Sequence, residues 1–172
     1  MPVDLRTLIR DVQDFPMTGI LFRDITPLLA NAEALRESVD RMCTAWRDRG
    51  VDLVAAMEAR GFMFAAPMAV QLGAGFVPVR KEGKLPWRTR SVEYTLEYRS
   101  DVLHVHEDAV RPGQRVLVVD DVIATGGTAE AVVRLLKELG ADVLGVQFLV
   151  ELRDLGGREL LNGYDVRSVI AY

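Results

Sequence analysis

RVLVVDDVIATGGT, residues 115–128, is the stretch of the sequence that decides the fold. The four apolar residues after Arg115 are typical of a buried strand, and the small residues at the other end lead into a helix expected from about 127 to 139. A strand, a turn and a helix in this order form one unit of an α/β protein, and ligands of such proteins bind beyond the carboxyl ends of the strands. The turn over 120–128 is therefore the first candidate for a binding site.

The second half of this turn has the composition of a phosphate site. Gly126 and Gly127 allow the main chain to approach an anion closely, and Thr125 and Thr128 supply hydroxyl donors. The helix that follows presents the free N–H groups and the positive dipole end of its first turn. Together these groups suit a monophosphate.

The first half of the turn, Asp120 and Asp121, needs a different explanation, because two carboxylates repel a phosphate. A carboxylate accepts a hydrogen bond from a hydroxyl, so the pair predicts a ligand with ribose hydroxyls, and it can also attract Mg²⁺. The sequence contains neither G-x-G-x-x-G nor G-x-x-x-x-G-K-[ST], which disfavours dinucleotide binding and P-loop NTPase activity. The alternative is a solvated acidic turn before an ordinary helix. The buried strand, the two acids and the helix entry together argue against it.

Strands and helices alternate along most of the remaining chain. The expected elements are helices over 4–12 and from Asn31 to about Arg49, strands over 53–57 and 75–80 with a helix between them that ends near Gly73, and a last strand over 143–150. Such an alternation implies an α/β fold with a mostly parallel sheet flanked by helices on both faces.

Two regions do not fit the alternation. Residues 81–107 are polar and rich in turns, and the pieces VEYTLEY and VLHVH within them predict a projecting hairpin arm. Residues 1–30 and the C-terminal DVRSVIAY are left to build a small cap, or hood. We therefore expect a single domain over 1–172 with a hood and an arm.

Composition and charge are ordinary for a globular protein, with 49% hydrophobic residues and a formal net charge of −4. This charge argues against binding to nucleic acid or to an anionic membrane surface. No apolar run approaches the ~18 residues of a membrane span, and the first residues lack the apolar core of a signal peptide. Cys43 is the one cysteine, which excludes a disulfide within the chain and favours a reducing cytoplasm. Its helical spacing with Val39 and Trp46 predicts a core position.

The segment 115–128 resembles the PRPP-binding motif of the type I phosphoribosyltransferases, in which four apolar residues and two acids precede a loop of small residues. The resemblance implies that Asp120 and Asp121 bind the 2′ and 3′ hydroxyls of the ribose. The residues implied for the 5′-phosphate are Ala124, Thr125, Gly126, Gly127 and Thr128. Members that act on hypoxanthine and guanine usually carry a third acid where Ala124 stands, so this position favours another base.

Three further stretches resemble the adenine phosphoribosyltransferase family, and the resemblance then spans almost the whole chain. The first is DFPMTGILFRDITPLL (14–29), which is similar to the N-terminal hood of that family. It implies that the main chain near Leu21 and Arg23 binds adenine and that Phe22 packs beside the base. In isolation these residues are more typical of a core. Their order along the chain with the other stretches favours the hood.

The other two stretches imply residues for the leaving group and for catalysis. EARGF (58–62) resembles the pyrophosphate-binding turn of the family, whose Glu58–Ala59 peptide is often cis, and VPVRKEGKLP with YTLEY resembles its mobile catalytic arm. Glu97 then stands at the acid/base position. The residues implied for pyrophosphate are Glu58, Ala59, Arg60, Gly61, Arg80, Lys81 and Lys84. The arm departs from the family pattern at three larger residues, Trp87, Arg88 and Arg99.

The resemblance implies a purine salvage enzyme that transfers ribose 5-phosphate from PRPP to adenine and gives AMP and pyrophosphate. Mg²⁺ is the implied cofactor, bound mainly through PRPP and not directly by protein ligands. In the family, the arginine at the position of Arg80 reaches into the neighbouring subunit. We therefore expect a cytoplasmic homodimer that binds the small molecules adenine and PRPP, and neither nucleic acid nor a membrane.

Two alternatives remain open. A phosphoribosyltransferase for xanthine, hypoxanthine or a pyrimidine would use the same motif, although Ala124 and the hood argue against it. A regulator that keeps the fold as a PRPP sensor and binds nucleic acid would usually add a domain or a basic face, for which this chain has neither the length nor the charge. His104 and His106 alternate on a strand and share a face, but with no cysteine nearby and no third ligand apparent they do not predict a metal site.

Overall fold

The protein is described by a computed structural model of residues 3–96 and 99–172. The chain divides into two compact units, Met1–Arg41 and Met42–Tyr172. In the described part of the chain, no helix combines the length and the apolar character needed to cross a membrane.

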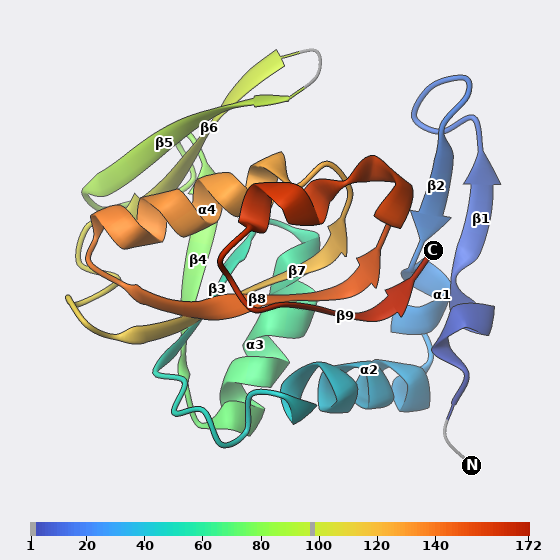
Figure 1. Cartoon of the computed structure of the whole chain (residues 1–172), viewed down its shortest axis with the longest axis horizontal. Coiled ribbons are helices and arrows are strands. Elements are labelled where there is room, and N and C mark those ends of the chain that lie inside the picture. The colour runs from blue at the N-terminus through green and yellow to red at the C-terminus, as the bar shows by residue number, and fades with distance from the viewer. Residues whose placement is uncertain (1–2, 97–98) are drawn as a thin grey trace. The chain divides into compact units, whose positions relative to one another are not determined.

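The larger unit is built on one sheet, whose described strands run in the order β5-β6-β4-β3-β7-β8-β9 (Figure 1). Neighbours from β4 to β9 pair in parallel, whereas β6 pairs antiparallel with both β4 and β5. The strands are β3 (Leu53–Met57), β4 (Gly75–Lys81), β5 (Thr89–Leu96), β6 (Arg99–His106), β7 (Arg115–Ile123), β8 (Asp142–Glu151) and β9 (Val166–Ala171). The predicted α/β fold with a mostly parallel sheet is confirmed.

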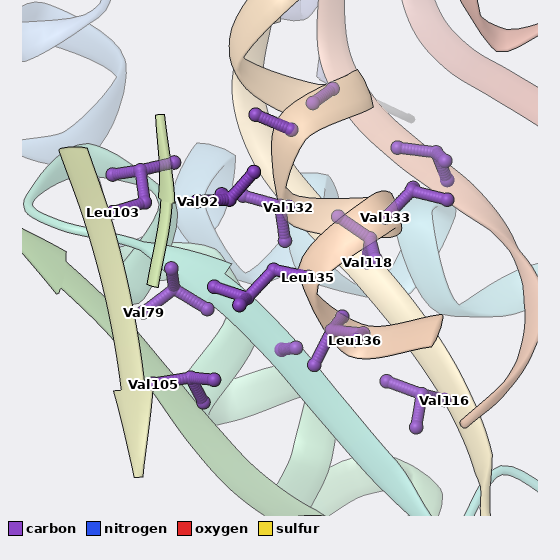
Figure 2. Packing of buried hydrophobic residues seen from close by; sticks show 14 of the residues in the cluster. Val79, Val92, Leu103, Val105, Val116, Val118, Val132, Val133, Leu135 and Leu136 are labelled. Atoms are coloured by element: carbon purple, nitrogen blue, oxygen red, sulfur yellow. The ribbon is translucent and has the colours of Figure 1, made fainter. Parts of the chain in front are cut away.

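Two helices, α3 (Arg60–Leu72) and α4 (Gly127–Glu138), cover opposite faces of this sheet (Figure 1). Side chains alternate across a strand, so Val116 and Val118 of β7 pack in one buried cluster with Leu135 and Leu136 of α4 (Figure 2). Burying one such side chain contributes roughly 1.5–3 kcal/mol. The valine-rich strands therefore form a sheet that is covered on both faces.

The C-terminal residues were expected to help build a cap, and this expectation was wrong. They form β9, which pairs with β8 at the edge of the sheet. The crossover between the two parallel strands consists of two short 3₁₀ helices, η2 (Arg153–Leu155) and η3 (Gly157–Leu161). Parallel strands are usually joined by an α-helix of ten or more residues. The missing helical pattern before β9 is the reason why the sequence did not predict this strand.

The hairpin expected in 81–107 is confirmed as β5 and β6, which pair along their whole length. It is joined to the sheet more closely than a projecting arm would be, because β6 also pairs with β4. Val92 of β5 and Leu103 of β6 lie in the same buried cluster as α4 (Figure 2). The base of the arm is therefore part of the core.

The smaller unit contains the region predicted as a hood. Its two-stranded antiparallel sheet pairs β1 (Arg10–Gln13) with β2 (Leu21–Asp24). The expected helix over 4–12 was wrong beyond Leu8, since η1 (Leu5–Leu8) is one 3₁₀ turn and Arg10 already begins β1. Pairing with β2 satisfies the main chain of β1 and overrides a weak helical pattern.

Helix α2 (Ala32–Thr44) follows the short α1 (Thr26–Leu29) and begins at the predicted cap. The Asn31 side-chain oxygen accepts a hydrogen bond from the Ala34 N–H at 3.0 Å, which is the usual N-cap interaction. The helix ends at Thr44 and not at Arg49 as expected. Cys43 is fully buried, which confirms the predicted core position.

Trp46 explains the early end of α2. Its side chain is fully buried, and its Nε1 donates a hydrogen bond to Gln147 Oε1 at 2.8 Å. The guanidinium groups of Arg49 and Arg167 lie 4.7 Å and 5.8 Å from the centre of its ring. These contacts hold the residues after α2 in turns instead of a further helical turn.

Candidate active site

A cavity of about 230 Å³ opens at the carboxyl end of β7, where the sequence predicted a binding site. The residues that line it are Met57, Arg60, Asp120, Asp121, Val122, Ile123, Ala124, Thr125, Gly126, Gly127, Thr128, Ala129 and Phe148. The two predicted ribose acids, the whole predicted 5′-phosphate loop and Arg60 therefore lie together. Met57, Val122, Ile123, Ala129 and Phe148 were not predicted, because apolar residues carry no signal that separates a cavity wall from a core.

The phosphate loop, Ala124–Thr128, enters α4 through Gly126. Gly126 has φ +85°, a left-handed conformation that side-chain-bearing residues rarely adopt, and its carbonyl accepts the Glu130 N–H at 3.0 Å. The N–H groups of the first turn of α4 therefore border the cavity, together with the positive end of the helix dipole. This geometry suits an anion, as the sequence predicted.

The two acids are arranged as a pair. Asp120 Oδ1 accepts the Asp121 N–H at 2.8 Å, and Arg60 Nε lies 2.9 Å from Asp121 Oδ2. The Asp121 carboxyl is 3% exposed, and the Arg60 N–H is not aimed well enough at Oδ2 to form a hydrogen bond. Burial of the Asp120 carboxyl and the nearby charge of Asp121 raise the pKa of Asp120 well above its usual value. Asp121 Oδ2 therefore has no hydrogen-bond donor within the described part of the chain, and a ribose hydroxyl is a donor that would suit it.

Gly61 determines how closely α3 approaches these acids. A Cβ at this position would lie 2.9 Å from Asp120 Oδ1 and 3.2 Å from the carbonyl oxygen of Val119. A side chain would therefore displace Asp120 or the main chain of β7. Gly61 was predicted as a pyrophosphate residue, and that role stays a prediction; the structure shows that it packs closely beside Asp120.

The remaining predicted pyrophosphate residues form a second cluster around Glu58. The Glu58–Ala59 peptide is cis, which confirms the prediction. The Glu58 carboxylate accepts hydrogen bonds from the Lys81 N–H at 2.8 Å and from Arg80 Nη2 at 2.9 Å. These contacts hold the pKa of Glu58 below its usual value, with the Lys81 main-chain hydrogen bond as the largest cause. Arg80 also donates to the carbonyl oxygen of Lys84 at 3.1 Å.

The predicted catalytic residue, Glu97, lies outside the described residues, as does Tyr98. The strand that leads to Glu97 is described, and it ends near the cavity. The carbonyl oxygen of Thr95 lies 3.9 Å from the position of a Cβ on Gly127. The end of β5 is therefore beside the phosphate loop.

The predicted adenine-binding residues belong to the smaller unit, whereas the cavity is lined by residues of the larger unit. Leu21, Phe22 and Arg23 all lie on β2, and each is half-buried. The rings of Phe15 and Phe22 meet edge to face with centroids 5.1 Å apart, and Arg23 forms an ion pair with Asp11. Their role in adenine binding stays a prediction.

Within residues 3–96 and 99–172, no group of three or more His, Cys, Asp or Glu side chains has the arrangement of a metal site. His104 Nδ1 lies 3.1 Å from Thr89 Oγ1, which gives one ring nitrogen a protein partner. The carboxylates of Asp120 and Asp121 are the hard oxygen donors that suit Mg²⁺ carried by a phosphorylated ligand.

A mostly parallel sheet with two acids and a glycine-containing loop at the end of one strand is the arrangement that the sequence predicted for a protein that binds a phosphorylated ribose. Comparisons with known proteins agree. A family model described as the phosphoribosyl transferase domain matches residues 26–170. An adenine phosphoribosyltransferase of Thermotoga maritima is 59% identical over 170 residues, which cover 99% of this chain and 98% of the relative.

Solved structures give the same result. The crystal structure of an adenine phosphoribosyltransferase from Thermoanaerobacter pseudethanolicus is 51% identical, with a TM-score of 0.95 and 98% of each chain covered. That of the Saccharomyces cerevisiae enzyme, complexed with an imino-altritol bisphosphate and adenine, is 37% identical, with a TM-score of 0.91 and 96% of each chain covered. The chain belongs to the phosphoribosyl transferase family, within its adenine phosphoribosyltransferase branch.

Proposed function

We propose that this chain transfers ribose 5-phosphate from PRPP to adenine and releases AMP and pyrophosphate. The observation that carries the proposal is the cavity at the end of β7, where Asp120, Asp121, Arg60 and the phosphate loop meet. The name of the Thermotoga maritima relative and the adenine bound to the yeast relative support adenine as the acceptor.

In this proposal the cavity binds PRPP through three kinds of contact. The hydroxyl groups of the ribose donate hydrogen bonds to Asp120 and Asp121, and the 5′-phosphate accepts hydrogen bonds from the loop Ala124–Thr128. Donors beside Asp120 stabilise its charged form and offset the repulsion within the pair. Once hydroxyls occupy Asp121, we expect Arg60 to turn toward the pyrophosphate.

The chemistry is a displacement at C1′ of the ribose. N9 of adenine forms the new bond as the bond to pyrophosphate breaks, and positive charge spreads over the ribose ring in the transition state. The carboxylates of Asp120 and Asp121 favour that charge, and fixed positions for both reactants lower the entropic cost of the step. Mg²⁺ bound through PRPP would neutralise the leaving pyrophosphate.

Glu97 would accept or share the proton that adenine loses from N9. A carboxylate that is partly shielded from water suits this task, since its pKa rises toward that of the group it serves. The end of β5 beside Gly127 supports this role, because Thr95 precedes Glu97 by only two positions. Closure of the arm would also keep water from C1′ and so prevent hydrolysis of PRPP.

The base is tested by incubating the protein with PRPP, Mg²⁺ and each of adenine, hypoxanthine, guanine, xanthine and a pyrimidine, and then separating the products by chromatography. We expect AMP to form far faster than any other nucleotide. A hood that hydrogen-bonds the 6-amino group is left with misplaced polar groups against a 6-oxo base, at about 1–3 kcal/mol each, or roughly ten- to hundredfold in rate. Equal turnover of hypoxanthine would exclude this base assignment.

We propose a cytoplasmic homodimer as the functional form. α3 exposes an apolar row at helical spacing, with Met63 40% and Val70 83% exposed and Ala66 and Pro67 between them. Such a row supports a self-complementary two-fold interface. Light scattering should give about twice the chain mass, and Val70→Asp should lower it. A wild-type monomer that is fully active at assay concentration would contradict the dimer.

A further inference from the structure

The phosphate loop rests against a second loop, at the start of η3. A Cβ on Gly126 would lie 2.2 Å from the carbonyl oxygen of Gly157. In the reverse direction, a Cβ on Gly157 would lie 2.3 Å from the carbonyl oxygen of Ala124 and 2.9 Å from the Gly126 nitrogen. The two main chains are therefore in direct contact, and a shift of Gly157 must move the phosphate loop.

The next residue, Arg158, anchors this second loop to the sheet. Its Nε donates a hydrogen bond to Glu151 Oε1 at 2.8 Å, and its Nη2 donates to Glu151 Oε2 at 2.7 Å. Its Nη1 donates a further hydrogen bond to the carbonyl oxygen of Val166 on β9. A guanidinium in such a bidentate pair has a fixed position and orientation, which a single hydrogen bond does not impose.

Glu151, the partner of Arg158, is itself held in place by its surroundings. It ends β8, is 6% exposed, and its Oε2 also accepts the Ser168 hydroxyl at 2.5 Å. The hydrogen bonds from Arg158, as the largest cause, lower the pKa of Glu151 to about 2. The ion pair therefore keeps its charge at every pH at which an enzyme of this kind works.

We propose that Arg158 is a positioning residue for the 5′-phosphate: it fixes Gly157, which in turn fixes the conformation of the Ala124–Thr128 loop. This inference rests on the proposed function, because it takes that loop as the phosphate site. Arg158 is absent from the residues that line the cavity, so it acts through Gly157 and not by contact with the ligand. The proposal gives a function to an ion pair that would otherwise only stabilise the fold.

A displaced phosphate loop should impair the use of PRPP and leave the binding of adenine unchanged. The loop binds the 5′-phosphate both in the ground state and in the transition state, so a displaced loop should raise KM for PRPP more than it lowers kcat. Binding of adenine does not involve the loop in this proposal. A loss of stability alone would instead affect both substrates equally, and would disappear below the unfolding transition.

The test compares Arg158→Met, Arg158→Lys and Ser168→Ala with the wild-type protein. Arg158→Lys keeps the charge but cannot form a bidentate pair with Glu151. Ser168→Ala removes only the hydrogen bond from the Ser168 hydroxyl to Glu151. Arg49→Met is the control, because Arg49 is 36% exposed against 45% for Arg158, and it also forms an ion pair, with Asp165, but lies outside the η3 segment. Steady-state kinetics with each substrate varied, thermal melting, and calorimetric titration with ribose 5-phosphate are measured for all of them.

We expect KM for PRPP and the dissociation constant of ribose 5-phosphate to rise roughly tenfold in Arg158→Met, about threefold in Arg158→Lys, and less than about twofold in Ser168→Ala. KM for adenine at saturating PRPP should stay within about twofold of the wild-type value in every variant. If Arg158→Met does not fold, the order of the other two variants and the control still decides. Arg158→Lys with unchanged ribose 5-phosphate binding, or with an equal rise in both KM values, would overturn the proposal. A wild-type protein that binds ribose 5-phosphate but makes no AMP would instead refute the proposed function.

Discussion

Two clusters around acidic side chains lie at the carboxyl ends of the neighbouring strands β7 and β8: Asp120 with Asp121, and Glu151 with Arg158 and Ser168. The two clusters differ in how many hydrogen-bond donors the negative charge receives. Asp120 and Asp121 repel each other, and Arg60, which contacts Asp121, is 49% exposed. Glu151 receives two hydrogen bonds from Arg158 and one from Ser168. Burial and the charge of Asp121 raise the pKa of Asp120, whereas the hydrogen bonds from Arg158 lower that of Glu151 to about 2.

The contrast distinguishes a candidate binding site from the scaffold that supports it. Asp121 Oδ2 has no hydrogen-bond donor among the described residues, although Arg60 is close, so hydroxyl donors from a ligand would improve this cluster. The Glu151 cluster already has its donors and gains nothing from a ligand. For this reason a carboxyl whose charged form is disfavoured often indicates a binding site, whereas one that already has its hydrogen-bond donors usually has a structural role.

The largest expected effect comes from breaking the contact between the two loops. Gly126→Ala places a methyl group 2.2 Å from the Gly157 carbonyl oxygen in a left-handed conformation, so we expect at least a hundredfold loss in kcat/KM for PRPP. Gly113→Ala is the matched control, with the same φ of +85° and open space around the Cβ position. It should lose about 1 kcal/mol of stability and keep its activity. Equal losses in both variants would show that backbone strain alone is responsible.

The second effect sharpens the comparison between the two clusters, because neutralising an acid should change the free energy of unfolding in opposite directions in them. Asp120→Asn and Asp121→Asn should each weaken use of PRPP roughly ten- to hundredfold, since a neutral acceptor replaces a charged one. Asp120→Asn should also raise the free energy of unfolding at neutral pH, because a repelled carboxylate is removed. Glu151→Gln should lower it by about 1–3 kcal/mol. Unchanged kinetics in both aspartate variants would remove the ribose-binding role.

The smallest effect is a difference in how stability depends on pH. The pKa of Asp120 is higher in the folded than in the unfolded protein, so its contribution to stability is lost as pH rises from about 3.8 through the raised value. The pKa of Glu151 is lower in the folded protein, so its contribution is lost as pH falls from 4.5 toward about 2. Urea unfolding over a pH series should show that the stability gained by Asp120→Asn grows with pH. A pH-independent difference would contradict the raised pKa.

The parts of the molecule that follow from local rules were predictable from the sequence. The apolar run before Asp120 and the glycines after it predicted β7, the loop and α4, because periodicity and turn chemistry act over a few residues. The Asn31 cap and the Gly73 end of α3 followed in the same way. These signals were enough to predict which residues line the cavity at its polar end.

The parts that depend on contacts distant in sequence were not predictable. β9 lies against β8 without a helix to announce it, and the buried Trp46 side chain, not a breaker residue, ends α2 early. The contact of Gly157 with the phosphate loop joins residues about thirty positions apart, and a Gly-Gly pair in the sequence indicates only a turn. The role of Arg158 could be recognised only after Glu151 and β9 were seen beside it.

Trp46 also gives the protein a built-in optical probe. The sequence contains two tryptophans, and they differ sharply in surroundings: Trp46 is fully buried beneath two arginines, whereas Trp87, at the foot of the hairpin arm, is 62% exposed. Fluorescence of the first should be emitted at shorter wavelength and resist iodide quenching, and fluorescence of the second should do neither. A Trp87→Phe protein would therefore report on unfolding of the sheet, and a Trp46→Phe protein on movement of the arm when substrates are added, without any attached dye.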